Sequence, residues 1–265
     1  MAPRHSASLG LHSELKRYNA IAAWEEQIAK FHGNAVVFGN AARFFIPCDL
    51  DRAETYLKRA KALDPDNDEW PEQLAHVYSL RAKRHGQESR KRDDATKALA
   101  ELDIAFGLSE SEEDKYQLLD LLATAAVEAG ELEKAGRYAM KLLKGAKECA
   151  ANWHYGNAIF EGHTVLGRVA LQKGDLESAK MHLLEAGKTP GSPQLDSFGP
   201  DMTLAKALLE KGEKAAVVRY LELCSTFWES GREALSEWRA QIADGKTPDL
   251  DWMEFRLKKP AGLEH

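Results

Sequence analysis

One stretch of the chain carries polar side chains at a spacing that would gather them on a single helical stripe. Five residues are separated by three, four, three and four positions, and such neighbours lie on the same face of a helix: His154, Asn157, Glu161, Thr164 and Arg168. Together they would present an imidazole, an amide, a hydroxyl, a carboxylate and a guanidinium. This combination suits the binding of a polar ligand.

His163 lies on the other side of the same expected helix, on an apolar stripe with Ile159, Leu166 and Ala170. That position predicts a buried histidine. Two interpretations follow: a hydrogen-bonded core residue, or a group that transfers a proton or contacts a ligand, because imidazole titrates near neutrality.

The segment from Thr189 to Met202 contains three Pro and two Gly residues, which predicts a stiff loop. A rigid polar loop facing a polar helix stripe predicts a ligand pocket with residues from both segments: His154, Asn157, Glu161, His163, Arg168, Gln194, Asp196 and Ser197. The alternative is a connector whose polar groups satisfy helix ends.

Several other chemistries are not indicated. Glu161 and His163 would point about 200° apart around a helix, and His154 with Glu161 supplies only two ligands where a zinc site needs at least three. The sequence has no phosphate-binding glycine loop and no Gly-x-Ser-x-Gly turn. Its three cysteines form no Cys-x-x-Cys pair. We therefore expect neither a metal nor a cofactor.

The composition restricts the class of molecule that the protein can bind. A formal net charge of −6 over 265 residues argues against nucleic acid as the main partner. Residues 81–97 differ, with seven Lys or Arg against three Asp or Glu; they form either a solvated extension between helices or a docking site for an acidic partner. No apolar stretch approaches the roughly 20 residues of a membrane span, and residues 1–13 lack the apolar run of a secretory signal. We expect a cytoplasmic, bacterial protein without a membrane partner.

The elements that must position these residues recur along the chain. A small residue, an apolar residue and a second small or apolar residue appear five times, with first positions 45, 37, 44 and 38 residues apart: Ala53/Leu57/Ala60, Ala98/Leu102/Ala105, Ala135/Ala139/Leu142, Ala179/Leu183/Ala186 and Val217/Leu221/Cys224. Periods of this length are typical of stacked helical hairpins. Turns at Gly130, Gly174 and Gly212 would end the first helix of three hairpins in the left-handed conformation.

These residues resemble the tetratricopeptide repeat over about residues 34–228. The segment from Gly191 to Met202, with Asn157 and His163, also resembles a group of bacterial tetratricopeptide proteins of uncharacterised function. The resemblance implies an all-α, right-handed α-solenoid of about five hairpins with capping helices. We expect a flexible tail at 1–13, one solenoid domain at 14–262 and a remnant of a histidine tag at 263–265.

In that family the first helix of each hairpin lines a concave groove, which in this chain would be apolar at one end and acidic toward its middle. The resemblance implies groove positions at Phe38, Phe45, Glu69, Glu72, His76, Asp120 and Thr124. An acidic groove suits a basic ligand. The sequence therefore predicts a non-catalytic module that binds a peptide or protein, and the acidic groove favours a basic one. The alternative is an enzyme or sensor with a small-molecule pocket between the fourth and fifth hairpins.

Overall fold

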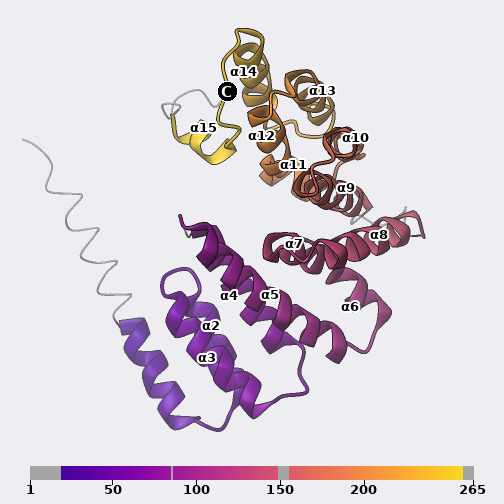
Figure 1. Ribbon diagram of the computed structural model, residues 1–265. Helices are drawn as coiled ribbons and strands as arrows, with labels where there is room; N and C mark the ends of the chain where they lie inside the picture. Colours follow the sequence, from indigo (N-terminus) through magenta and orange to yellow (C-terminus); the bar gives the residue numbers. More distant parts are fainter. Residues whose placement is uncertain (1–18, 85, 149–154, 259–265) are drawn as a thin grey trace, which may run out of the picture. The chain divides into compact units, whose positions relative to one another are not determined.

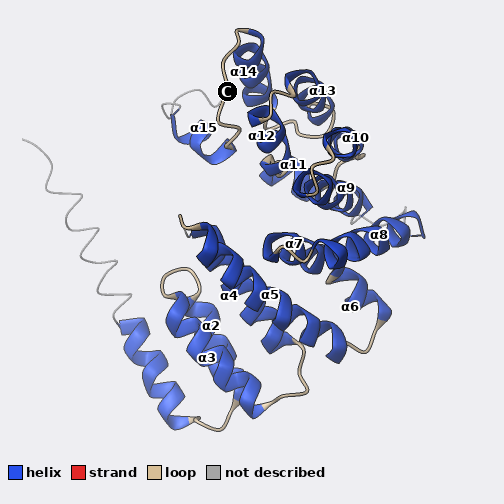
Figure 2. Cartoon of the chain, viewed as in Figure 1, coloured by secondary structure: helices blue, strands red, loops and turns tan. Residues whose placement is uncertain are grey.

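The computed structural model describes residues 19–84, 86–148 and 155–258, and throughout this part of the chain the only regular secondary structure is helix (Figures 1 and 2). Helices pack with their neighbours in sequence as successive pairs, which is consistent with a helical repeat array. Within the span predicted as one domain, the contacts divide the chain after Glu110 into two compact units. Each unit is described by itself.

The first unit consists of a helix over residues 19–30 followed by two helical pairs. The pairs are α2 (Ala35–Phe45) with α3 (Leu50–Leu63), and α4 (Glu69–Arg84) with α5 (Glu88–Leu108). The Asn34 side chain accepts a hydrogen bond from the Val36 amide, 3.0 Å away, and so caps α2. At Gly39 a Cβ would lie 2.2 Å from the Trp70 ring, so glycine permits α2 and α4 to approach closely.

The second unit continues the pairing through shorter helices. Its elements are α6 (Glu112–Gln117), α7 (Leu119–Ala129), α8 (Leu132–Glu148), α9 (Tyr155–Gln172), α10 (Leu176–Gly187), α11 (Pro193–Phe198), α12 (Thr203–Glu210), α13 (Lys214–Cys224), α14 (Arg232–Ala243) and α15 (Trp252–Lys258). The most extensive helix contacts of this unit join α9 with α10, α8 with α9 and α7 with α8.

Three turns end a helix in the same way, with a glycine in the left-handed conformation, as the sequence predicts. Gly130, Gly174 and Gly212 have φ angles of 81°, 83° and 85°. In each turn the amide of the following residue donates to a carbonyl five residues back, for example Asp175 to Ala170 at 2.9 Å. This 6→1 bond ends the first helix of a pair and reverses the chain.

The small residues of the repeated pattern are buried where the paired helices meet. Ala53, Ala98, Ala135, Ala179 and Val217 are all 0% exposed. Side chains of this size let two helix backbones approach closely, and the sequence pattern correctly predicts these positions as buried.

The basic segment and the proline-rich segment are more helical than expected. Helix α5 begins at Glu88, so most of residues 81–97 belongs to α4 and α5 rather than to an extension between them. Residues 193–198 form α11 instead of a loop, because Ser192 caps it and Pro193 is acceptable in its first turn. Asp201 then accepts a hydrogen bond from the Thr203 amide at the start of α12.

The chain returns onto the second unit at its C-terminal end. Trp238 of α14 is buried, and Trp228 is 0% exposed. The Trp252 ring of α15 lies edge-on to Trp228 with centroids 5.1 Å apart, and Phe255 stacks on Trp252. These aromatic contacts cover the end of the helical array. Within the described ranges, no helix is long and apolar enough to cross a membrane.

Candidate ligand pocket

A pocket of about 160 Å³ lies in the second unit, where five elements meet. It is lined by residues of α6 and α7, the middle of α8, the first turn of α9 and the first turn of α11: Tyr116, Gln117, Asp120, Leu142, Asn157, Ala158 and Gln194. The pocket therefore joins Asp120, which the sequence assigned to a groove, with Asn157 and Gln194, which it assigned to a pocket.

Tyr116 forms one wall because α8 has no side chain at the point of contact. A Cβ on Gly145 would lie 2.3 Å from the Tyr116 ring, so only glycine permits this approach. The Tyr116 hydroxyl donates to the Leu142 carbonyl at 3.0 Å. This contact attaches the short helix α6 to α8 and presents the aromatic ring as a fixed apolar surface.

The opposite wall forms where residues 189–192 cross the start of α9. The buried Thr189 hydroxyl donates to the Gly156 carbonyl at 2.7 Å and accepts from the Gly191 amide at 3.2 Å. A Cβ on Gly156 would lie 1.8 Å from the Gly191 carbonyl oxygen. The two backbones are therefore in direct contact, and this contact determines where Asn157 and Gln194 lie.

A chain of three polar side chains links these segments. Ser192 Oγ donates to Asn157 Oδ1 at 2.5 Å, and Asn157 Nδ2 donates to Gln194 Oε1 at 2.8 Å. Ser192 also caps α11 by accepting from the Leu195 amide at 3.0 Å. The sequence analysis missed Tyr116, Leu142 and Ser192 as site residues. A serine directly before proline at a helix start was the available signal for Ser192.

Most other residues predicted for the pocket lie elsewhere. Asp196 accepts from the Glu229 amide at 2.8 Å through its carboxylate, and its carbonyl accepts from Ser230, so it holds a later turn in place. Arg168 pairs with Glu128 of α7 at 3.7 Å. Ser197 is exposed, and Glu161 is partly buried on α9. Neither Ser197 nor Glu161 lines the pocket. His154 falls outside the described residues.

His163 faces a second histidine that sequence reasoning did not select. Its Nδ1 lies 3.1 Å from Nδ1 of His182 on α10, with ring centroids 5.3 Å apart. One ring can donate and the other accept at this distance. Burial lowers the His182 pKa, and the carboxylates of Glu185 and Asp175 oppose that effect. The pair joins the two helices of a hairpin and lies apart from the pocket lining.

The predicted groove residues of the first unit are largely occupied within the chain. Phe38 and Phe45 are buried against Tyr56 of α3, with centroids 6.1 and 5.6 Å apart, so they form core instead of groove. This corrects the sequence prediction: their apolar faces turn toward the partner helix of the pair. Glu69 forms an ion pair with Arg43.

Three predicted groove residues keep some exposure. Glu72 and His76 are exposed on α4. The His76 ring is still partly shielded from water, and this partial burial, with the charge of Lys83, lowers its pKa. Thr124 is partly buried on α7, one turn after Asp120.

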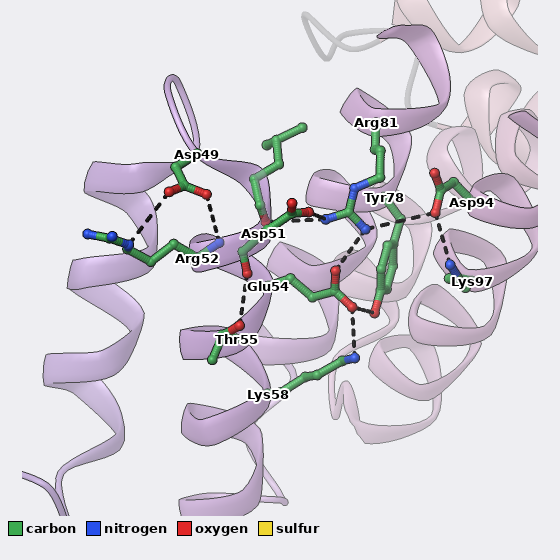
Figure 3. Close-up of polar contacts among 11 residues, drawn as sticks. Asp49, Asp51, Arg52, Glu54, Thr55, Lys58, Tyr78, Arg81, Asp94 and Lys97 are labelled. Carbon is green, nitrogen blue, oxygen red and sulfur yellow. Dashed lines mark hydrogen bonds and ion pairs between the residues drawn. The ribbon is translucent and has the colours of Figure 1, made fainter. Parts of the chain in front are cut away.

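A second polar cluster connects α3, α4 and α5 in the first unit (Figure 3). Arg81 of α4 donates to Glu54 at 2.7 Å and to Asp51 at 2.8 Å, and it approaches Asp94 of α5 at 4.0 Å. The Tyr78 hydroxyl donates to Glu54 at 2.9 Å. Arg81, which lies in the basic segment 81–97, is thus part of the packing of three helices.

Lys58 and Lys97 complete this cluster. Lys58 lies 2.7 Å from Glu54 and Lys97 lies 3.1 Å from Asp94, so three cations face three carboxylates. Burial alone would raise the Glu54 pKa, but hydrogen bonds from Lys58, Arg81 and Tyr78 more than offset it and lower the pKa from 4.5 to about 2. The neutralised charges indicate a structural network.

Within residues 19–84, 86–148 and 155–258, no three or more His, Cys, Asp or Glu side chains are grouped so that they could hold a metal ion. A wider groove of about 420 Å³ between α13 and α14 has an apolar floor of Val218, Ile242 and two alanines.

No family model and no curated protein matches the chain. The interpretation of function therefore depends on the geometry of the pocket itself.

Proposed function

We propose that the chain is a non-catalytic interaction module whose second unit binds a segment of a peptide or protein partner in the pocket of Tyr116, Asp120, Asn157 and Gln194. One observation carries the proposal: Asp120 of α7, Asn157 of α9 and Gln194 of α11 share one small pocket with the Tyr116 ring and Leu142. A concave site that combines apolar surface with a few polar groups from separate segments is typical of ligand sites.

The repeat pattern supports the same interpretation. Sequential pairs, buried small residues and identical glycine turns support the resemblance to tetratricopeptide proteins, and with it a right-handed solenoid. In that family the first helix of each hairpin faces the partner. Asp120 of α7 and Asn157 of α9 occupy such first helices and both line the pocket.

Part of the acidity predicted for the groove is neutralised within the chain, because Glu128 pairs with Arg168 and Glu69 with Arg43. The enzyme alternative has less support. Of its eight predicted residues, Asn157 and Gln194 line the pocket, whereas Asp196 and Arg168 contact other parts of the chain.

The test is a selection of random peptides on the whole protein, followed by measurement of their affinity. Gln117 is exposed at the rim, so Gln117→Trp should fill the pocket without disturbing the core and weaken binding at least tenfold. Glu210→Trp, an exposed position on α12 outside the lining, is the matched control and should bind normally. Peptides that bind equally well to Gln117→Trp would refute the pocket as the binding site.

A further inference from the structure

We propose that a groove on the outer face of α13 is a second docking surface, and that it accepts an acidic amphipathic helix of a partner protein. The groove lies between α13 and the last turn of α14, two helices that pack side by side (Figure 1). Its lining shares no residue with the pocket at Tyr116. Helix α13 is the second helix of its pair with α12, whereas Asp120 and Asn157 of the pocket lie on first helices. The proposal therefore goes beyond the proposed function.

The outer face of α13 is accessible to solvent. The side of the helix that faces the core carries its buried residues: Val217, Tyr220, Leu221 and Cys224. The groove residues of α13 recur three or four positions apart on the other side of the helix: Lys214, Ala215, Val218, Arg219 and Glu222. All of these are exposed or partly exposed. The helix therefore presents a second face, with apolar side chains at its centre and charged ones at its edges.

The floor of the groove consists of small apolar side chains, which favours a helix as the occupant. Ala215 and Ala243 are exposed, Val218 is partly buried and Ile242 is buried beneath them. Small side chains let two helix backbones approach closely, as they do between the paired helices of this chain. Nine residues, 214–222, extend over about 12 Å at 1.5 Å per residue, or roughly two helical turns. A partner helix can therefore place the apolar residues of one stripe along this floor.

The edge of the groove carries more positive than negative charge. Arg219 and Arg239 both contact the Glu222 carboxylate, at 2.9 and 3.4 Å, so two guanidinium groups share one carboxylate. Lys214 donates to the Gly245 carbonyl at 3.5 Å, and this neutral acceptor leaves its charge in place. Among the lining residues and their ion-pair partners, three cations therefore stand against one carboxylate. An acidic partner is complementary to this edge, although the whole chain has a formal net charge of −6.

The Arg219 guanidinium can bind a partner carboxylate without losing its contact to Glu222. That contact uses its Nη1 group, and a guanidinium has five N–H donors. Exposed ion pairs are weak, so Glu222 does not hold the largely exposed Arg219 side chain against a competitor. Nucleic acid fits less well, because none of the seven lining residues has an aromatic ring on which a base could stack. The floor and the edge together select a helix whose apolar stripe is flanked by Asp or Glu.

The test is a library of helical peptides with an apolar stripe and with Glu, Gln or Lys at the flanking positions. Peptides are selected on the whole wild-type protein and counter-selected on Ala243→Trp, which fills the groove from an exposed position; Ala240→Trp, exposed on α14 outside the lining, is its control. Arg219→Glu reverses one charge of the groove. Arg232→Glu is the matched control, because both arginines are about equally exposed, at 62% and 63%, and both pair with a glutamate three residues away.

We expect enrichment of Glu at the flanks and, in fluorescence anisotropy, about tenfold weaker binding when Gln replaces it or when the protein carries Arg219→Glu. Ala240→Trp and Arg232→Glu should bind normally, and added salt should weaken binding to the wild type. Enrichment of Lys or Gln, or a failure to find peptides that distinguish the wild type from Ala243→Trp, would overturn the proposal. A dimer of the protein in sedimentation that Ala243→Trp abolishes would also overturn it, in favour of a second copy as the occupant. Peptides bound at the pocket are removed by the counter-selection, so each of these outcomes leaves the proposed function in place.

Discussion

Neutralising Glu54 should destabilise the first unit, because this carboxylate is the acceptor shared by three donors from two helices. Lys58, Tyr78 and Arg81 all lie within 2.9 Å of it. Its side chain is 19% exposed, so water replaces these contacts only in part. Glu54→Gln keeps the shape of the side chain and removes the charge that the network is built around.

The magnitude follows from the pKa. Lowering the Glu54 pKa from 4.5 to about 2 corresponds to about 3.4 kcal/mol at roughly 1.36 kcal/mol per pKa unit. The Lys58 side chain is 60% exposed, so solvent screens its contribution and the upper value is reduced. We expect Glu54→Gln to lower the free energy of unfolding by about 1–3 kcal/mol at pH 7.

The sign of the pH dependence is determined by the same shift. A depressed folded-state pKa means that the unfolded chain takes up a proton first as the pH falls. The stabilisation is therefore complete above about pH 4.5 and is lost between there and about pH 2. Glu54→Gln should flatten this part of the stability curve, because it has no proton to bind.

Hydrogen exchange read by mass spectrometry suits the assay, because it reports α3 and α4 separately from the second unit. Protection of both helices should fall in Glu54→Gln at pH 7, whereas Glu88→Gln, a largely exposed carboxylate on α5, should leave it unchanged. Equal protection in Glu54→Gln and the wild type, together with an unchanged acid response, would refute the network as a source of stability.

Three further predictions concern the second unit. Burial lowers the His182 pKa, so the free energy of unfolding should fall as the pH drops below about 6.5. His182→Gln should weaken this pH dependence in denaturant titrations. An unchanged pH dependence of the unfolding free energy would contradict the assignment of the effect to His182. Ala179 is 0% exposed, so Ala179→Leu should overpack the α9–α10 pair and cost about 1–3 kcal/mol; a melting temperature equal to the wild type's would speak against close helix packing. Gly156→Ala should cost about 3 kcal/mol or more, because its methyl group would meet the Gly191 carbonyl; full tolerance in thermal unfolding would show that the loop does not contact α9.

The sequence by itself predicted the local architecture correctly. Helix periodicity and the turns at Gly130, Gly174 and Gly212 depend on contacts within a few residues, and both appear in the structure. The burial of the small residues could also be predicted from the sequence, because two helices pack closely only where the side chains on the repeating face are small. The α11 helix was missed because its proline suggested a loop, although proline is compatible with a first helical turn.

Only the tertiary structure decided which polar groups meet. Asn157 contacts Ser192 and Gln194, and His163 meets His182, across 19 to 37 residues of chain. Such pairings depend on the rotation and offset of whole helices, which periodicity does not specify. A position on a helical face tells which side chains can point outward together. The close contact between the start of α9 and the loop at Gly191 determines which of them share a pocket.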